Sequence, residues 1–217
     1  MQQASLHVKR IVSLAEGQSI EITWITSSSP PHYFNLSNSY VELTSIGVLK
    51  MEIKVVELNP MKVASFQYVG ENPELNAFKE MITWAQEKNL LSKNMRYHFF
   101  GFNNPIPTED NPVYGYEVWL PLDDDFEGDG EIKIKEFKGG LFAVTEMLFS
   151  DFLSGQDWNV FHSAAKLWMK ENMYEFDSTV QWLEEHITEK KEIENFIQKN
   201  DLPKWNIGLY LPIRKIG

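Results

Sequence analysis

The chain has 217 residues, of which 43% are hydrophobic, and a net charge of -11 at pH 7. That length suits one large domain, or a short segment followed by one domain. The absence of cysteine excludes disulfides and thiolate catalysis, and the acidic charge opposes binding to a phosphate backbone. The first residues contain no long apolar run, so we expect neither a signal peptide nor a transmembrane helix, and a cytoplasmic protein.

Residues 1–50 differ in composition from the rest of the chain. They hold three of the 20 basic residues and three of the 31 acidic ones, so residues 51–217 carry the whole net charge. We place a domain boundary after residue 50. Apolar spacing predicts helices over residues 7–15 and 20–25, and a third helix is predicted from Pro30 to Tyr40. We therefore expect a small helical N-terminal segment.

After residue 50, one sequence pattern occurs twice. Residues 52–58 (EIKVVEL) recur as residues 131–137 (EIKIKEF), and both stretches predict strands. A turn follows in each copy, and a second strand is predicted over residues 62–68 and 141–148. The turn of the second copy, Gly139-Gly140, is interpreted as a hairpin turn.

The two copies continue in the same order. Apolar residues at helical spacing predict a helix over residues 73–91 and another over residues 156–171. Each copy closes on a strand that ends in Leu-Pro and an apolar residue, at residues 116–122 and 207–213. This order predicts a duplicated β-β-α-β unit with a central cleft between the two halves. A cleft between repeats is a common place for a ligand.

The region resembles the GyrI-like family, the effector-binding domains of bacterial transcription activators. The resemblance rests on MEIKVVELNPMKVASFQYVG, RYHFFGFNNPIP, VYGYEVWLPL, GEIKIKEFKGGLFAV, QWLEEHI and IGLYLPIR, in that order along residues 51–217. It implies an α+β, SHS2-type fold of two repeats with an antiparallel sheet. It also implies binding of small molecules, often hydrophobic cations, in the cleft between the repeats. It also implies that aromatic side chains line the cleft and that a carboxylate lies at its base.

The resemblance assigns the cleft carboxylate to Glu184, through the motif LEEH at residues 183–186. A carboxylate among aromatic rings attracts a delocalised cation, and each ring adds ~0.5–2 kcal/mol. The same carboxylate could act as a general base toward water. The alternative is that Glu184 is an exposed member of an acidic run.

Glu117 is a second candidate. Strand alternation places it on one face with Trp119 and places Tyr116 on the other face. Glu117 could complete a cation cage, or it could pair with a lysine on the next strand. The candidate aromatic residues of the cleft are Tyr68, Trp119 and Trp182, and each could equally belong to the core.

Residues 14–50 resemble the second helix-turn-helix of AraC-type regulators. The matching positions are Ser19-Ile20, Ser28-Ser29-Pro30, Tyr33, Tyr40 and Thr44. Basic residues on that family's third helix are replaced here by Asn35, Asn38 and Ser39, which removes the phosphate contacts. The resemblance implies a degenerate remnant of a DNA-binding domain, so DNA is not expected as a partner.

Three functions remain open from the sequence. The first is a protein that captures hydrophobic, cationic small molecules. The second is a hydrolase of reactive small molecules with Glu184 as its base, so whether the chain is an enzyme is uncertain. The third is a regulator that keeps weak DNA or partner binding through residues 1–50. The five histidines lack metal-ligand spacing and no phosphate loop occurs, so we expect no metal, cofactor or membrane partner.

Overall fold

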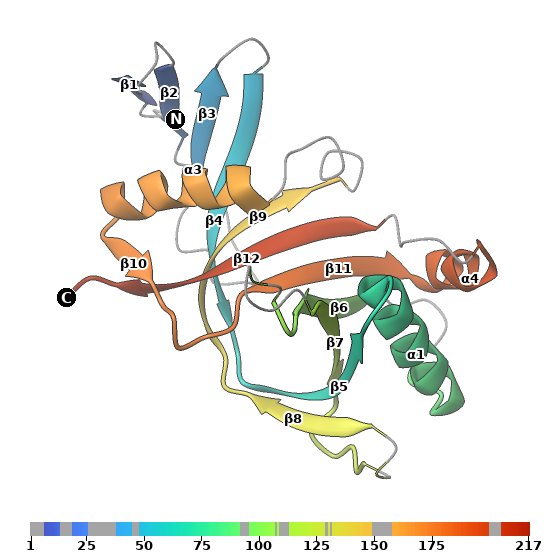
Figure 1. The fold of residues 1–217 in the computed structure, drawn as a ribbon. Coiled ribbons are helices and arrows are strands. Elements are labelled where there is room, and N and C mark those ends of the chain that lie inside the picture. The colour runs from blue at the N-terminus through green and yellow to red at the C-terminus, as the bar shows by residue number, and fades with distance from the viewer. Residues whose placement is uncertain are drawn as a thin grey trace, which may run out of the picture.

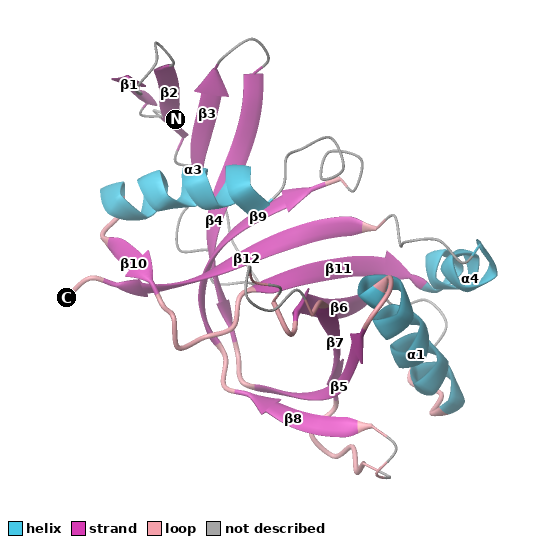
Figure 2. Cartoon of the chain, viewed as in Figure 1, coloured by secondary structure: helices cyan, strands magenta, loops and turns pink. Residues whose placement is uncertain are grey.

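The computed structural model describes residues 51–91, 96–106, 108, 113–128, 130, 132–148, 158–199 and 205–217, and the backbone alone of residues 7–13, 19–25, 38–44 and 48–50. The protein is α+β, as predicted, with helices packed on one antiparallel sheet (Figure 1; Figure 2). The helices are α1 (Pro73–Glu87), α3 (Trp158–Glu171) and α4 (Lys190–Lys199).

From residue 51 on, the predicted strands occur in the predicted order, with further strands between them. The strands of the described chain are β1 (His7–Ser13), β2 (Ser19–Ile25), β3 (Asn38–Thr44), β4 (Val48–Leu58), β5 (Met61–Val69), β6 (Arg96–Asn103), β7 (Gly115–Leu122), β8 (Lys133–Phe137), β9 (Gly140–Met147), β10 (Tyr174–Phe176), β11 (Leu183–Glu189) and β12 (Asn206–Lys215). The first copy of the repeat contains β4, β5, α1, β6 and β7, and the second contains β8, β9, α3, β11 and β12.

Twelve strands of the described chain form one sheet, in the order β1-β2-β3-β4-β9-β12-β11-β6-β7-β5-β8, with β10 paired to β12. The two copies meet at its centre, where β6 pairs with β11. Each copy also sends its first strand into the other half, because β4 pairs with β9 and β8 pairs with β5. This exchange joins the predicted duplicated units into a single sheet.

The helices cover one face of the sheet and leave an apolar cluster on the other. Figure 1 shows α1 and α3 over opposite halves of the sheet, with β11 and β12 running between them. The α1 core is centred on Phe78 and the α3 core on Phe161. A third cluster, which includes Trp119 and Tyr210, lies on the opposite face. Alternation along each strand therefore buries side chains on both faces.

The predicted hairpin turn at Gly139-Gly140 is wrong. The flanking strands β8 and β9 pair with β5 and β4, so the chain turns a corner at Gly139. Gly139 has φ +77°, and a Cβ there would lie 2.4 Å from the carbonyl oxygen of Leu58. Leu58 ends β4 at the corner of the first copy, before Asn59 and Pro60. The two corners therefore touch, and the contact leaves no space for a side chain.

The predicted N-terminal helices are also wrong. Residues 7–13 and 19–25 are strands that pair as an antiparallel hairpin, and β3 pairs with β4. The sequence of β2, SIEITWI, alternates apolar and polar residues, and that period favours a strand over a helix. Most of the third predicted helix lies outside the described residues, but its end, from Asn38 to Tyr40, is strand.

The proposed domain boundary after residue 50 falls inside β4, which runs from Val48 to Leu58. One part of β4 pairs with β3 and a later part pairs with β9. The backbone thus continues through this position within one sheet. The boundary stays a prediction about evolutionary units.

Gly139→Ala should destabilise the fold by about 2–4 kcal/mol, through the left-handed backbone and the contact with Leu58 together. The measurement is urea unfolding followed by circular dichroism. Gly130 is the matched control, because its φ is +87° and no atom of the described chain lies within 4 Å of its Cβ position. Gly130→Ala should cost only about 1 kcal/mol. Equal costs at the two positions would contradict the contact between the corners.

Candidate functional site

Glu184 lies on the helix-covered face at the centre of the sheet. It opposes Gly101 of β6 and Leu209 of β12. Its side chain is 12% exposed. The alternative of an exposed acidic residue therefore does not describe its surroundings.

Both carboxylate oxygens of Glu184 accept hydrogen bonds from aromatic side chains. The hydroxyl of Tyr116 donates to Oε2 at 2.6 Å, and the indole Nε1 of Trp158 donates to Oε1 at 2.5 Å. Nε2 of His186 lies 3.3 Å from the Tyr116 hydroxyl and 3.9 Å from Oε2 of Glu184. We call these four residues the Glu184 site. They come from β7, α3 and β11, so both copies contribute to it.

Gly101 makes the contact between Tyr116 and Glu184 possible. A Cβ at Gly101 would lie 2.2 Å from the Tyr116 hydroxyl oxygen, so a side chain there would displace the ring. The ring is buried, and burial, followed by the charge of Glu184, raises the pKa of Tyr116 well above its usual range. The phenol therefore stays a hydrogen-bond donor.

Glu184 and Gly101 occupy equivalent positions in the two copies. Both β7 and β12 contain Leu-Pro, and aligning these pairs makes Val118 equivalent to Leu209. Gly101 opposes Val118, and Glu184 opposes Leu209. Since Glu184 and Gly101 also oppose each other, they flank the seam between the copies. One copy supplies the carboxylate and the other supplies the space.

Two of the predicted aromatic residues lie near this site. The rings of Trp182 and Trp158 meet edge to face, with centroids 4.7 Å apart. Tyr68 opposes Tyr116 in the pairing of β5 with β7 and packs against the α1 core. Trp182 therefore lies one ring away from Glu184, whereas Tyr68 is a neighbour of Tyr116.

Glu117 and Trp119 lie together on the opposite face, as strand alternation predicted. Glu117 is buried and accepts hydrogen bonds from Trp119, Ser65, Asn104 and Lys135. Burial acts to raise the pKa of Glu117, but these bonds, with Lys135 first, lower it overall. The arrangement matches the lysine-pair alternative, with Lys135 on β8, two strands from β7. The structure does not bring Glu117 to Glu184.

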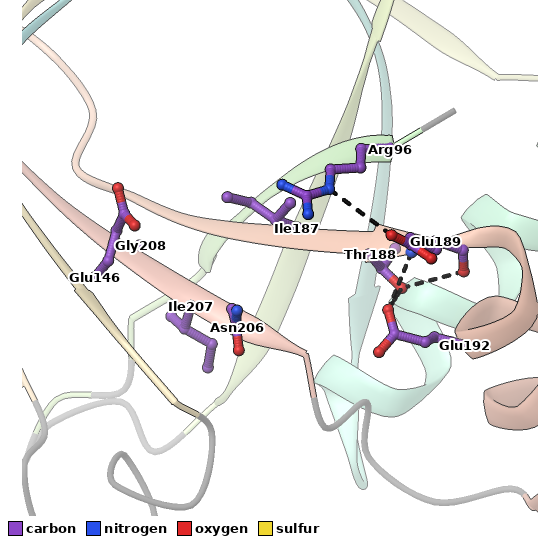
Figure 3. A pocket seen from close by; sticks show the side chains of 9 residues that line it. All are labelled: Arg96, Glu146, Ile187, Thr188, Glu189, Glu192, Asn206, Ile207 and Gly208. Carbon is purple, nitrogen blue, oxygen red and sulfur yellow. Dashed lines mark hydrogen bonds and ion pairs between the residues drawn. The ribbon is translucent and has the colours of Figure 1, made fainter. Parts of the chain in front are cut away.

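A polar cavity of about 330 Å³ lies further along β11, away from Glu184 (Figure 3). Its lining includes the ion pair of Arg96 and Glu189, at 3.8 Å, and the Glu146 side chain on the other side. These three side chains are each at least 60% exposed. The cavity is thus a solvated groove between exposed charged groups, whereas the Glu184 side chain is buried.

A family model described as integron-associated effector binding protein matches residues 54–213, about three quarters of the chain. The chain belongs to this family. The predicted effector-binding, GyrI-like resemblance is confirmed. The match begins after residue 50, and the strands β1 to β3 replace the helices that an AraC-type segment needs, so the AraC-type prediction has no support.

The solved structures that resemble this chain have low sequence identity to it and TM-scores below 0.5. EcmrR in its complex with DNA is 12% identical, with a TM-score of 0.47 over 76% of this chain and 58% of that one, so this chain spans under two thirds of EcmrR. SAV2435 bound to tetraphenylphosphonium is 10% identical, with a TM-score of 0.42 over 76% and 94%. A Vibrio cholerae integron cassette protein is 12% identical, with a TM-score of 0.33 over 75% and 95%. The comparison with curated proteins found no match.

Sequence reasoning missed several residues around the carboxylates of this effector-binding chain. Tyr116, Trp158 and His186 at the Glu184 site were not predicted as site residues. Glu185 was missed on the opposite face, where it accepts a hydrogen bond from Tyr210 and lies 2.6 Å from Nδ1 of His98. The sequence LEEH could have indicated the position of Glu185, because consecutive carboxylates on a strand point to opposite faces.

The described residues show neither a metal-binding cluster nor a membrane-spanning helix. They contain no group of three or more histidine, aspartate and glutamate side chains arranged to hold a metal ion. None of their helices is both long enough and apolar enough to cross a membrane.

Gly101→Ala should cost about 2–4 kcal/mol of unfolding free energy, because the new methyl group collides with the Tyr116 ring. In a Tyr116→Val background, the same change should cost less than about 1 kcal/mol. Urea unfolding of the four proteins measures this coupling. Additive effects would show that Gly101 acts independently of Tyr116.

The stability contributed by His98 should fall as pH rises. The hydrogen bond with Glu185 comes first among the causes that raise the pKa of His98 above 6.5. A raised folded pKa gives stabilisation that is complete below the unfolded value and is lost as pH passes the folded value. The difference in unfolding free energy between wild type and His98→Gln should therefore be larger at about pH 5 than at about pH 9. His162→Gln, on the exposed side of α3, is the control, and a pH-independent difference for His98 would contradict the pairing.

Proposed function

We propose that this chain is an effector-binding protein that captures a small hydrophobic cation at the Glu184 site. The observation that carries the proposal is a buried carboxylate held by Tyr116 and Trp158 beside further aromatic rings. Membership of an effector-binding family supports a small-molecule ligand. The cationic character of that ligand is inferred from the side chains.

Glu184 has a more distant basic partner than the other two buried glutamates of the described chain. Glu117 pairs with Lys135, and Glu185 pairs with His98 at 2.6 Å. Within the described chain, no lysine or arginine forms an ion pair with Glu184, and the nearest basic group is His186 at 3.9 Å. A buried charge is normally paired. A cationic ligand would supply the missing charge.

The surrounding rings suit a cation with an apolar surface. Trp158 contacts both Trp182 and Phe161, with ring centroids 4.7 and 5.7 Å apart. A cation over such faces gains about 0.5–2 kcal/mol for each ring. Glu184 would therefore provide the charge contact, and the indoles would provide apolar area and cation–π contact.

The hydrolase alternative is less well supported by this geometry. A general base must reach the proton of a water, but each oxygen of Glu184 already has a protein donor. Electrostatic capture uses the carboxylate as it is held. Product formation from each bound compound should nevertheless be followed, because turnover would favour the hydrolase.

Glu184→Gln should weaken binding of tetraphenylphosphonium by at least about tenfold, because the amide removes the charge while keeping the shape. Tryptophan fluorescence measures the titration, since Trp158 and Trp182 lie at the site. Triphenylphosphine oxide is the neutral comparison and should be insensitive to the change. Glu189→Gln, on the same strand with a 64% exposed side chain, is the matched control. Equal cation affinity in wild type and Glu184→Gln would overturn the proposal.

A further inference from the structure

His186 is a buried polar residue at the Glu184 site, and aromatic packing holds its ring. The side chain is 6% exposed. Phe78 of α1 meets the imidazole edge to face with ring centroids 4.8 Å apart, and Trp205 lies edge to face at 6.3 Å. Nδ1 is buried and has no hydrogen-bond partner among the described residues, whereas Nε2 lies 3.3 Å from the hydroxyl oxygen of Tyr116. The two ring nitrogens therefore have different surroundings.

The single proton of the Tyr116 hydroxyl is directed at Glu184. Burial, followed by the charge of Glu184, raises the pKa of Tyr116 well above its usual range, so the phenol keeps its proton. The distance of 2.6 Å between the hydroxyl oxygen and Oε2 is typical of an O–H group that donates to a carboxylate. The hydroxyl oxygen of Tyr116 is therefore left as an acceptor toward His186.

This direction decides which nitrogen of His186 carries the proton. A neutral imidazole has one N–H donor, and its other nitrogen is an acceptor. With the proton on Nε2, the ring donates to the Tyr116 oxygen. With the proton on Nδ1, two acceptors would face each other at 3.3 Å, and a buried donor would have no partner among the described residues. The contacts therefore favour the Nε2–H tautomer.

We propose that His186 is a positioning residue for ligand binding, which donates from Nε2 to Tyr116 while Tyr116 donates to Oε2 of Glu184. This inference rests on the proposed function of Glu184 and adds the group that holds the carboxylate in place. Tyr116 is 1% exposed, whereas Trp158, the donor to Oε1, is partly exposed. His186 and Tyr116 therefore support Glu184 from its buried side, and a ligand would reach it from the side of Trp158.

The donors in series affect binding through the orientation of Glu184. Hydrogen bonds in a chain polarise one another, so donation from His186 strengthens the bond between Tyr116 and Oε2. A carboxylate that is already held in one orientation loses less freedom when a ligand binds. The distance of 3.3 Å is long for an N–H···O bond. We therefore expect a loss of about fivefold without the His186 donor, which is smaller than the loss from removing the charge.

The tautomer is measured on the full-length protein labelled with 15N-histidine, in two-dimensional 1H–15N correlation spectra near neutral pH. Signals that disappear in His186→Phe assign this residue among the five histidines. Nε2 should have the chemical shift of a protonated nitrogen, and Nδ1 that of an unprotonated one. The opposite pattern, or two protonated nitrogens, would overturn the inference.

Tryptophan fluorescence titration with tetraphenylphosphonium measures the effect on binding. His186→Phe keeps a buried ring without a donor and should weaken binding about fivefold. His186→Gln places an amide N–H near the position of Nε2 and should recover the affinity to within about twofold of wild type. In a Tyr116→Phe background, His186→Phe should cause no further loss, because the chain of donors is already broken. His162→Phe, at an exposed position on α3, is the matched control and should leave the affinity unchanged.

The outcomes separate this inference from the proposed function, and thermal unfolding checks that each variant is folded. Equal losses from His186→Phe in the two Tyr116 backgrounds, or no recovery in His186→Gln, would show that His186 acts only by packing. An equal loss of affinity for the neutral triphenylphosphine oxide would show the same. Each of these results would overturn the inference alone. A wild type that does not bind tetraphenylphosphonium would overturn the proposed function, and the role of His186 in binding with it.

Discussion

The pairing of β6 with β11 is the contact on which the rest of the structure depends. It joins the two copies of the repeat and places Gly101 opposite Glu184. A carboxylate in both copies would bring two like charges together at the sheet centre, at a considerable electrostatic cost. Glycine in one copy avoids that repulsion and gives Tyr116 the space to reach across the seam. The two copies thus place equivalent strands side by side, but only one of them has a carboxylate at the centre of the sheet.

The buried carboxylates on the two faces of the sheet have different partners. On the face opposite the helices of the described chain, Glu117 and Glu185 each accept a hydrogen bond from an aromatic side chain, Trp119 or Tyr210, and each has a basic partner. Those pairs are internally complete. On the helix-covered face, Glu184 has the aromatic donors without lysine or arginine among the described residues. The same kind of hydrogen bond therefore accompanies an ion pair with lysine or a close histidine on one face, and a carboxylate without lysine or arginine on the other.

The repeated pattern allowed most of the fold to be predicted. From residue 51, the two opening strands, the long helix and the last strand of each copy follow from apolar periodicity and from EIKVVEL and EIKIKEF, whereas β6 and β11 are additional to the predicted unit. The prediction for the N-terminal segment failed because SIEITWI alternates apolar and polar residues at the period of a strand, and the helical interpretation did not follow that period. At the site, family resemblance selected Glu184, but Trp158 looked like an ordinary core residue of a helix. Tyr116 could be placed on a face, yet its partner lies 68 residues away.

The sequence by itself determined the repeat, the alternation of side chains along each strand and the opposite directions of Glu184 and Glu185, because these depend on local backbone geometry. Only the tertiary structure decided which strands exchange between the copies and where the corners cross. It also decided which groups contact each carboxylate, because Lys135, His98 and Trp158 reach their carboxylates from elements distant in the chain. Pairing between distant strands sets those distances, so the local sequence pattern cannot predict them.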